Sequence, residues 1–276
     1  MKEIQVFEKK LLKKVSEVNY DKTNVISYSQ FSSYQSCPKQ WALKNVFKHR
    51  DDKPSIHIIF GQGFHVTFQH LISLYFQKTV KAAEAFDFKG MLKTEMVKEY
   101  QILKTKFNNQ DFSTPQELSE FYHDGVAIIE WFKKKRAQYF STRTHELIGI
   151  EVPLFITILE GNERRVVFLG YIDLILKDKR NGIYTLYDIK TSTNGWNEYK
   201  KKDALITSQL VLYKHFFAEQ YGIEIDKIEI QYLIVKRKLK QNTEFPQKRL
   251  QEFSPTSGPI VTNRVLKDLN TFIKDN

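Results

Sequence analysis

Two apolar runs in the second half of the chain contain carboxylates. Asp173 stands in the run Gly-Tyr-Ile-Asp-Leu-Ile-Leu, and Asp188 is followed two residues later by Lys190 in the run Leu-Tyr-Asp-Ile-Lys. Both runs are typical of β-strands, and because side chains alternate between the faces of a strand, Asp188 and Lys190 are expected to share one face. An ionised aspartate among apolar side chains costs several kcal/mol unless it is paired or binds a metal ion.

A divalent cation is one way to stabilise these acids. If a hairpin through the turn signal Asn181-Gly182 pairs the two strands, Asp173 and Asp188 lie close together. Two adjacent carboxylates repel each other, and a hard cation with oxygen ligands relieves that repulsion. The competing interpretation is a buried salt bridge between either acid and Lys190. The strand pattern alone leaves both interpretations open.

Short β-branched runs, which begin at about residue 146, must form the sheet that positions these acids. Turn signals separate the first three runs, so they predict an antiparallel meander, and a helix, a strand and a last helix follow it. The predicted strands cover residues 146–159, 166–176, 183–190 and 228–235, and the predicted helices cover about 203–221 and 259–274. This order predicts an α/β fold with a mixed β-sheet, an antiparallel meander plus a crossover strand, flanked by helices.

The first half of the chain has a mostly helical pattern. Predicted helices cover residues 1–20, a short segment capped by Ser27 or Ser29 that breaks at Cys37-Pro38, and about 60–76, 89–106 and 115–140. No repeat and no Gly/Ser linker interrupts the chain. We therefore expect a single domain over residues 1–276, with a mainly helical part at 1–145 and a sheet-containing part at 146–276.

Five short motifs follow one another over roughly residues 27–213. They are Ser27-Tyr28-Ser29-Gln30-Phe31 through Tyr34, Cys37-Pro38 and Trp41; Gly61-Gln62-Gly63-Phe64-His65; Gly170-Tyr171-Ile172-Asp173; Asp188-Ile189-Lys190-Thr191-Ser192; and Gln209 with Tyr213. In this order they resemble the motifs of the RecB-like, CRISPR-associated-exonuclease-like branch of the PD-(D/E)XK nuclease superfamily. Each motif is weak alone, but the shared order and the consistent secondary structure make a strong signal.

The resemblance implies a restriction-endonuclease-like core with a helical N-terminal lobe, so that residues 1–276 form a single nuclease domain. It also implies metal-dependent hydrolysis of DNA phosphodiester bonds. Mg²⁺ or Mn²⁺ would polarise the phosphate and generate hydroxide from bound water. The implied metal ligands are His65, Asp173, Asp188 and the main-chain carbonyl of Ile189. Without the resemblance, a histidine beside an apolar helix stripe such as His65 is more often a hydrogen-bonded core residue.

The resemblance assigns further roles around the same site. Lys190 would orient the attacking water and favour its deprotonated form, and Gln209 would hold a phosphate or that water. Tyr213, one turn after Gln209, would support the substrate or Lys190. Both α-helical residues equally suit a purely packing role. Glu151 is a candidate for an acid that supports the metal ligands or binds a second metal ion, although an exposed strand glutamate is the more ordinary description.

The charge of the chain predicts a polyanionic partner. The 276 residues include 43 Lys and Arg against 32 Asp and Glu, which gives a formal net charge of +11. Nucleic acid is the first partner to consider and an anionic membrane surface the second. Most of the charge is lysine, which contacts phosphate without reading sequence. Lys200, Lys201 and Lys202 are candidate DNA-backbone contacts, and Trp196 or Tyr199 is a candidate base-stacking platform, although solvated helix faces also explain such runs of lysine.

Several cofactors and compartments are excluded by what the sequence lacks. The single cysteine, Cys37, cannot hold the iron–sulfur cluster that several RecB-like relatives carry, and no Walker-type phosphate loop is present. We therefore expect no iron–sulfur cluster and no nucleotide cofactor, and any helicase or recombination protein would be a separate partner. The chain has no apolar run long enough to cross a membrane and no signal peptide, so a cytoplasmic location is expected.

The function predicted from these features is a sequence-nonspecific DNA exonuclease in recombination, repair or DNA degradation. It would suit a bacterial cell or a phage. One alternative is a structure-selective DNA endonuclease with the same site in an open groove. The other is a non-catalytic DNA-binding subunit with the same fold, whose discriminating feature would be a broken acid-x-lysine core; here Asp173, Asp188 and Lys190 are all present.

Overall fold

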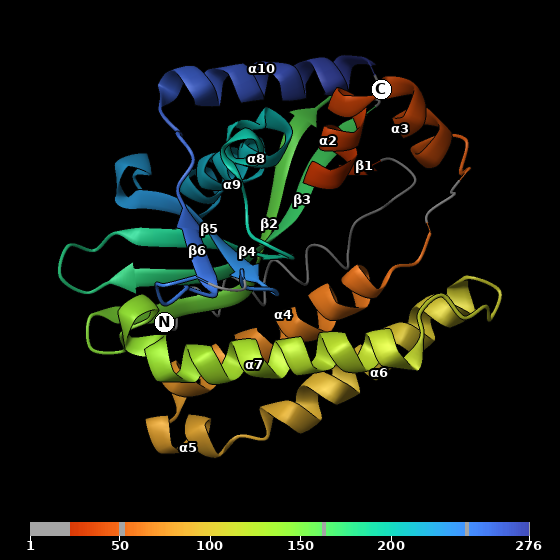
Figure 1. The fold of residues 1–276 in the computed structure, drawn as a ribbon. Coiled ribbons are helices and arrows are strands. Elements are labelled where there is room, and N and C mark those ends of the chain that lie inside the picture. Colours follow the sequence, from red (N-terminus) through yellow and green to blue (C-terminus); the bar gives the residue numbers. More distant parts are fainter. Residues whose placement is uncertain (1–22, 50–52, 162–163, 241–242, 276) are drawn as a thin grey trace.

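The computed structural model describes residues 23–49, 53–161, 164–240 and 243–275. The helix predicted over residues 1–20 lies outside these ranges. The described chain forms a mixed sheet of six strands between two layers of helices (Figure 1). This arrangement confirms the α/β class and is consistent with a restriction-endonuclease-like core.

The predicted meander and crossover form the body of the sheet. The hairpin turns after β2 and β3 make the first three long strands antiparallel, and helix α9 carries the chain to a strand that is parallel to β4. These elements are β2 (His145–Glu160), β3 (Arg165–Asp178), β4 (Tyr184–Ser192), α9 (Ala204–Tyr221) and β5 (Ile228–Lys236). Alternation of apolar residues and turn residues such as Gly182, at φ 73°, is sufficient to predict them.

Two short strands complete the sheet at positions that were not predicted. β1 (Thr23–Ile26) pairs in parallel with residues 165–168 of β3, and β6 (Leu250–Phe253) pairs with β5. Because β2 occupies one edge of β3 along its length, β1 and β4 share the other edge. β4 pairs only with residues 174–177, so a gap of five residues, 169–173, separates the two partners along that edge.

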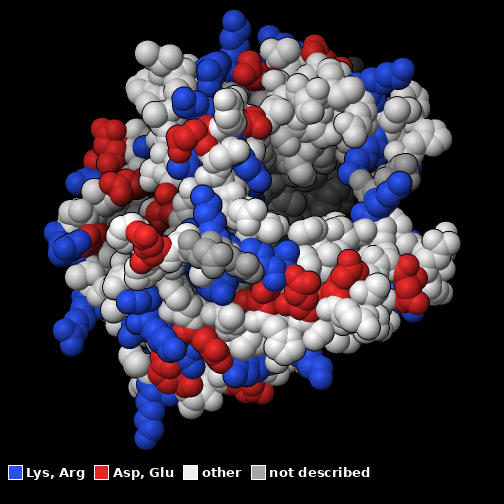
Figure 2. Space-filling model, viewed as in Figure 1, with Lys and Arg blue, Asp and Glu red and all other residues white. Residues whose placement is uncertain are grey.

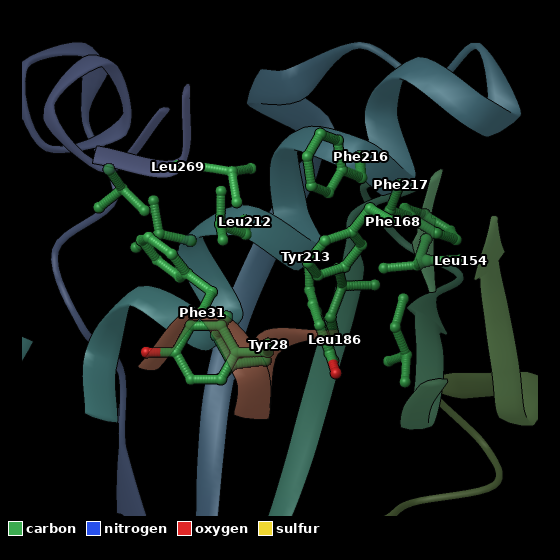
Figure 3. Packing of buried hydrophobic residues seen from close by; sticks show 14 of the residues in the cluster. Tyr28, Phe31, Leu154, Phe168, Leu186, Leu212, Tyr213, Phe216, Phe217 and Leu269 are labelled. Atoms are coloured by element: carbon green, nitrogen blue, oxygen red, sulfur yellow. The ribbon is translucent and has the colours of Figure 1, made fainter. Parts of the chain in front are cut away.

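Four helices cover one face of the sheet and bury one of the two hydrophobic clusters. They are α2 (Tyr28–Ser36), α3 (Pro38–Asn45), α9 and α10 (Pro259–Asp275). Figure 3 shows how residues of these helices meet strand residues such as Phe168 and Leu186. The N-terminal segment that carries Phe31 therefore packs on the same side as the C-terminal helix, where Phe31 contacts Phe272.

The helical lobe covers the opposite face. It consists of α4 (Ile56–Gln77), α5 (Val80–Ala85), α6 (Phe88–Lys106) and α7 (Pro115–Tyr139), as Figure 1 shows. Thr114 and Glu117 form a capping box at the start of α7, which fixes where that helix begins. Phe64 and Phe68 of α4 are fully buried, and Phe68 packs against Phe132 of α7. Burial of each such ring stabilises the lobe by roughly 1.5–3 kcal/mol.

Two smaller helical elements lie in the connections after β4 and α9. They are α8 (Glu198–Lys202) and a single turn of 3₁₀ helix at Ile225–Lys227. None of the described helices combines the length and the apolar character that crossing a membrane requires.

Candidate active site

At Glu151, the side chains of β2 switch from one face of the sheet to the other. Ile150 packs with the helical lobe, but Val152, two residues later, lies in the core on the opposite face. In a regular strand these two side chains would share a face. The change is made at Glu151, whose φ of 52° is in the left-handed region that L residues other than Gly, Asn and Asp rarely adopt. Such strained residues cluster at functional sites.

β3 makes the same change directly opposite. Ile150 pairs with Leu174 and Val152 pairs with Ile172, so Glu151 lies across from Asp173. Ile172 belongs to the core under α9, whereas Leu174 belongs to the core under the helical lobe. Asp173 is also the last residue of the gap between β1 and β4. The two acids therefore stand where the sheet divides.

His65 of α4 brings a third ligand atom to these two acids. Its Nε2 lies 3.5 Å from Asp173 Oδ2 and 3.6 Å from Glu151 Oε1. One ligand atom from each of the three residues lies within 4.8 Å of the other two. Nε2 of His65 is buried and has no hydrogen-bond partner among the described residues. The three ligand atoms thus point at a common centre but make no hydrogen bonds to one another.

The second acid of the sequence motif lies beside this group. Asp188 is 2% exposed, and Lys190 Nζ lies 3.0 Å from its Oδ1 and 2.8 Å from its Oδ2. Only the Oδ1 contact has hydrogen-bond geometry, so the buried Oδ2 lacks a hydrogen-bond partner in the described part of the chain. Between these residues, the main-chain N–H of Ile189 donates to Asp173 Oδ2 at 2.6 Å. Asp173 thereby replaces the missing strand-to-strand hydrogen bond of the gap.

Burial and mutual repulsion set the protonation of the group. Burial, and then the charge of Asp188, raise the pKa of Asp173 well above its usual range. Burial lowers the pKa of His65, and the nearby carboxylates Glu151 and Asp188 oppose that effect only in part. Burial also works against a charged Lys190, but Asp188 and Asp173 outweigh it and raise the pKa of the ammonium. The imidazole is therefore neutral and the lysine charged at neutral pH.

The donor set fits a divalent cation. A neutral imidazole nitrogen and carboxylate oxygens are common metal ligands, and the unpartnered Nε2 of His65 is aimed at the two carboxylates. The elevated pKa of Asp173 agrees with this fit, because burial and the repulsion of Asp188 outweigh the nearby charge of Lys190, so that a further positive charge would favour the ionised carboxylate.

Gln69 is the part of this site that the sequence motifs did not indicate. It lies on α4 one turn after His65, is 5% exposed, and its Nε2 donates to Glu151 Oε1 at 2.7 Å and to the main-chain oxygen of Asp173 at 2.9 Å. A buried amide four residues after His65 on a helix dominated by apolar side chains is the signal that would have identified it.

The two α9 residues of the last motif lie together. Gln209 Nε2 donates to the hydroxyl of Tyr213 at 3.4 Å. Burial is the main cause that raises the pKa of Tyr213 to about 12, and the charges of Asp188 and Lys190 also act on it. A Cβ on Gly170 would stand 3.0 Å from the ring of Tyr213, so this glycine allows the ring to lie against β3.

The predicted DNA-contact residues divide into two kinds. Lys200 and Lys202 of α8 are exposed, while Lys201 is half-buried and pairs with Glu198 at 2.7 Å. Exposed lysines of this kind are compatible with contacts to a phosphate backbone. Figure 2 shows further Lys and Arg side chains on the rim of a hollow between the part of the molecule that carries α2 and α3 and the helical lobe.

The prediction of a base-stacking role for Trp196 is wrong. Trp196 is 6% exposed and packs against Tyr232 and Phe253, with ring centroids 4.9 Å and 6.3 Å away. Its main chain makes a two-bond pair with Gln251, and the positive φ of Gly195 turns the chain inward just before it. A face already covered by core residues cannot stack on a base.

Comparison with known proteins agrees with this geometry. The family model described as the PD-(D/E)XK nuclease superfamily matches residues 25–270. A search of curated proteins found no match. The matched range includes the second half of β1, the three acid-bearing strands β2, β3 and β4, α4 with His65, and α9.

Proposed function

The chain belongs to the PD-(D/E)XK nuclease superfamily, and on this premise we propose that it is a divalent-metal-dependent DNA nuclease of the RecB-like branch. The observation that carries the proposal is the group formed by His65, Glu151 and Asp173 next to the Asp188–Lys190 pair. We extend the proposal to one nuclease domain over residues 1–276, in which the mainly helical part, 1–145, and the sheet-containing part, 146–276, share the site.

Five residues would hold the cation in this proposal. His65, Glu151 and Asp173 already face one another, and Asp188 with the Ile189 carbonyl completes the set implied by the family motif. When bound, Mg²⁺ or Mn²⁺ supplies Lewis acidity toward a phosphate oxygen and toward a coordinated water.

The remaining residues act on the substrate and on protons. Lys190 carries its positive charge at Nζ, 2.8 Å from Asp188, where it offsets charge that grows on the phosphate in the transition state and orients the attacking water. The amide of Gln209 donates to the hydroxyl of Tyr213, and these two residues position the phosphate and Lys190 relative to each other. The raised pKa of Tyr213 keeps its hydroxyl protonated, so this residue donates a hydrogen bond and does not act as a base.

The substrate in this proposal is DNA, bound through its backbone, and the reaction is exonucleolytic. Support for a backbone-bound substrate comes from the net charge of +11 and the exposed Lys200 and Lys202. Support for attack at DNA ends comes from the helical lobe, because this lobe, which includes His65, covers one face of the sheet. A structure-selective endonuclease and a silent DNA-binding subunit are the outcomes that the test distinguishes.

The test is degradation of labelled linear and circular single-stranded DNA in Mg²⁺, in Mn²⁺ and in EDTA. Wild type is expected to degrade linear DNA in either metal, and Lys190→Ala to lose at least about a hundredfold in rate. Lys267→Ala, at an exposed position of α10 away from the site, is the matched control for loss of one lysine. Persistent cutting of circles would establish an endonuclease. Metal-independent binding without any cleavage would establish the silent subunit, and equal cutting by Lys190→Ala would refute the mechanism.

A further inference from the structure

Helix α4 has an exposed face without charge beside the candidate active site. Its 22 residues contain no Lys, Arg, Asp or Glu, although the chain is 27% charged and about six such residues are expected in that length. The helix is not fully buried, because Ile58 is 43% exposed and Val66 is 40% exposed, and Gln62 and His70 are exposed as well. An exposed helix face ordinarily carries charge.

These residues form one stripe with the catalytic side chains. At 3.6 residues per turn, Ile58, Gln62, Val66 and His70 follow the side of α4 that also carries His65. The stripe is therefore continuous with the proposed metal site.

Two cavities lie along this stripe on either side of the acid group. The first, of about 270 Å³, is between the start of α4 and the end of β4 and includes Gln62, His65 and Lys190 in its lining. The second, of about 380 Å³, is between the middle of α4 and β2 and includes Gln69 and His70. Among the described residues that line the two cavities, Lys190 is the one Lys or Arg, and it stands at the catalytic group.

The charges decide which part of a nucleic acid fits the stripe. A phosphate backbone is held by cations, and here the cation is at Lys190. Aliphatic and amide side chains suit bases, which have apolar faces and hydrogen-bonding edges. A duplex keeps its bases stacked inside and presents phosphates to a helix of this kind. An unpaired strand can place its scissile phosphate at the acids and its bases along α4.

We propose that the uncharged face of α4, defined by Ile58, Gln62, Val66 and His70, is a contact surface for the bases of an unpaired nucleic-acid strand whose phosphate lies at the acid group. This inference rests on the proposed function and adds to it the strandedness of the substrate and the surface that reads it. Duplex DNA is excluded because this face of α4 carries no cations, so the phosphates of a duplex would lie against apolar side chains.

Photo-crosslinking tests the surface in a catalytically disabled background. The background protein carries Cys37→Ser, which removes the single native cysteine, and Asp173→Asn, which disables catalysis. Gln62→Cys or His70→Cys then introduces one cysteine, to which a benzophenone label is attached. The matched control is Ile260→Cys on α10, which is 87% exposed. The probes are an oligothymidylate of about 20 nucleotides and a blunt hairpin duplex, and binding of each is followed by fluorescence anisotropy.

The expected result is that the single strand crosslinks at positions 62 and 70 with a yield at least about fivefold above that at position 260, and above that of the hairpin. Equal yields at all three positions, preference for the hairpin, or no binding of the single strand would overturn the inference. If wild type degrades DNA in Mg²⁺ while the labels fail to react, the proposed function stands and the base-contact surface falls.

A kinetic measurement gives an independent readout. A carboxylate introduced by Val66→Glu repels a nearby strand, so KM for single-stranded DNA is expected to rise about fivefold or more at low salt with kcat within about twofold. Ile260→Glu carries the same added charge away from the site and serves as its control. A KM unchanged by Val66→Glu in folded protein contradicts the assignment.

Discussion

Two glycines in the motif that precedes His65 should respond to alanine in opposite directions. Both lie inside α4, two residues apart, so each alanine gains the same helix propensity of about 1 kcal/mol. Their surroundings differ. A Cβ on Gly61 would meet Thr191 Oγ1 at 3.5 Å, which is ordinary contact, whereas a Cβ on Gly63 would stand 2.8 Å from Met96 Cγ and 3.1 Å from its backbone nitrogen.

The magnitudes follow from these distances. Gly61→Ala keeps the propensity gain and is expected to stabilise the protein by about 0.5–1 kcal/mol. Gly63→Ala adds the cost of overpacking, about 1–3 kcal/mol, because the backbone of α6 cannot yield as a side chain can. The free energy of unfolding of the two variants should therefore differ by about 1–3 kcal/mol, which corresponds to about 2–6 °C in Tm for a chain of this size.

The assay is urea unfolding of both variants and wild type in EDTA, followed by tryptophan fluorescence, with Tm from calorimetry as a second measure. EDTA removes any contribution from metal binding to the comparison. An unchanged m-value is required for the interpretation, since it shows that the same surface unfolds in each protein. If alanine stabilises the protein equally at both positions, close approach of α4 and α6 is not the reason for glycine at position 63, and the reasoning fails.

Three further predictions concern the acid group. The pKa of Asp173 is raised in the folded state, so the metal-free protein should lose stability as pH rises from about 4 through that folded pKa. Tm measured in EDTA over this pH range should fall in wild type, and it should fall less in Asp173→Asn. Saturating Mn²⁺, at about 100 times its Kd, should stabilise wild type by about 2.7 kcal/mol in calorimetry and leave Asp173→Asn unchanged. Gln69→Leu should weaken Mn²⁺ affinity about 10–100-fold in calorimetric titration. Thr67→Val, which loses one buried hydrogen bond on the same helix, should bind Mn²⁺ as wild type does.

The parts of the fold that could be predicted from the sequence are those with a local signal. The meander, α9 and β5 follow from alternation and from turn residues, and the structure confirms them. β1 and β6 have four residues each, and β1 pairs with residues about 140 positions away in the chain. Such short strands form because a partner edge is available, and that edge is a property of the assembled sheet.

The site shows the same limit. The acid-x-lysine pattern correctly places Asp188 beside Lys190, because two residues on one strand face share a direction. Glu151 has the pattern of an ordinary strand glutamate, and its left-handed backbone arises from the change of face that the sequence does not display. Trp196 was misjudged for a related reason. A loop aromatic has no local feature that says whether it faces solvent or the core.

The division of the sheet explains why acids can be buried here at all. In a continuous sheet the N–H of Ile189 would bond to a neighbouring strand, but the gap between β1 and β4 leaves it to Asp173. Asp188 lies near that carboxylate on the side of the gap, and Glu151 lies near it on the other side, through the pairing of β2 with β3. With all three carboxylates ionised, the single ammonium of Lys190 and a neutral imidazole would leave two negative charges, and burial together with this repulsion raises the pKa of Asp173. A divalent cation supplies the matching charge, so the feature that interrupts the sheet also creates the demand for the metal.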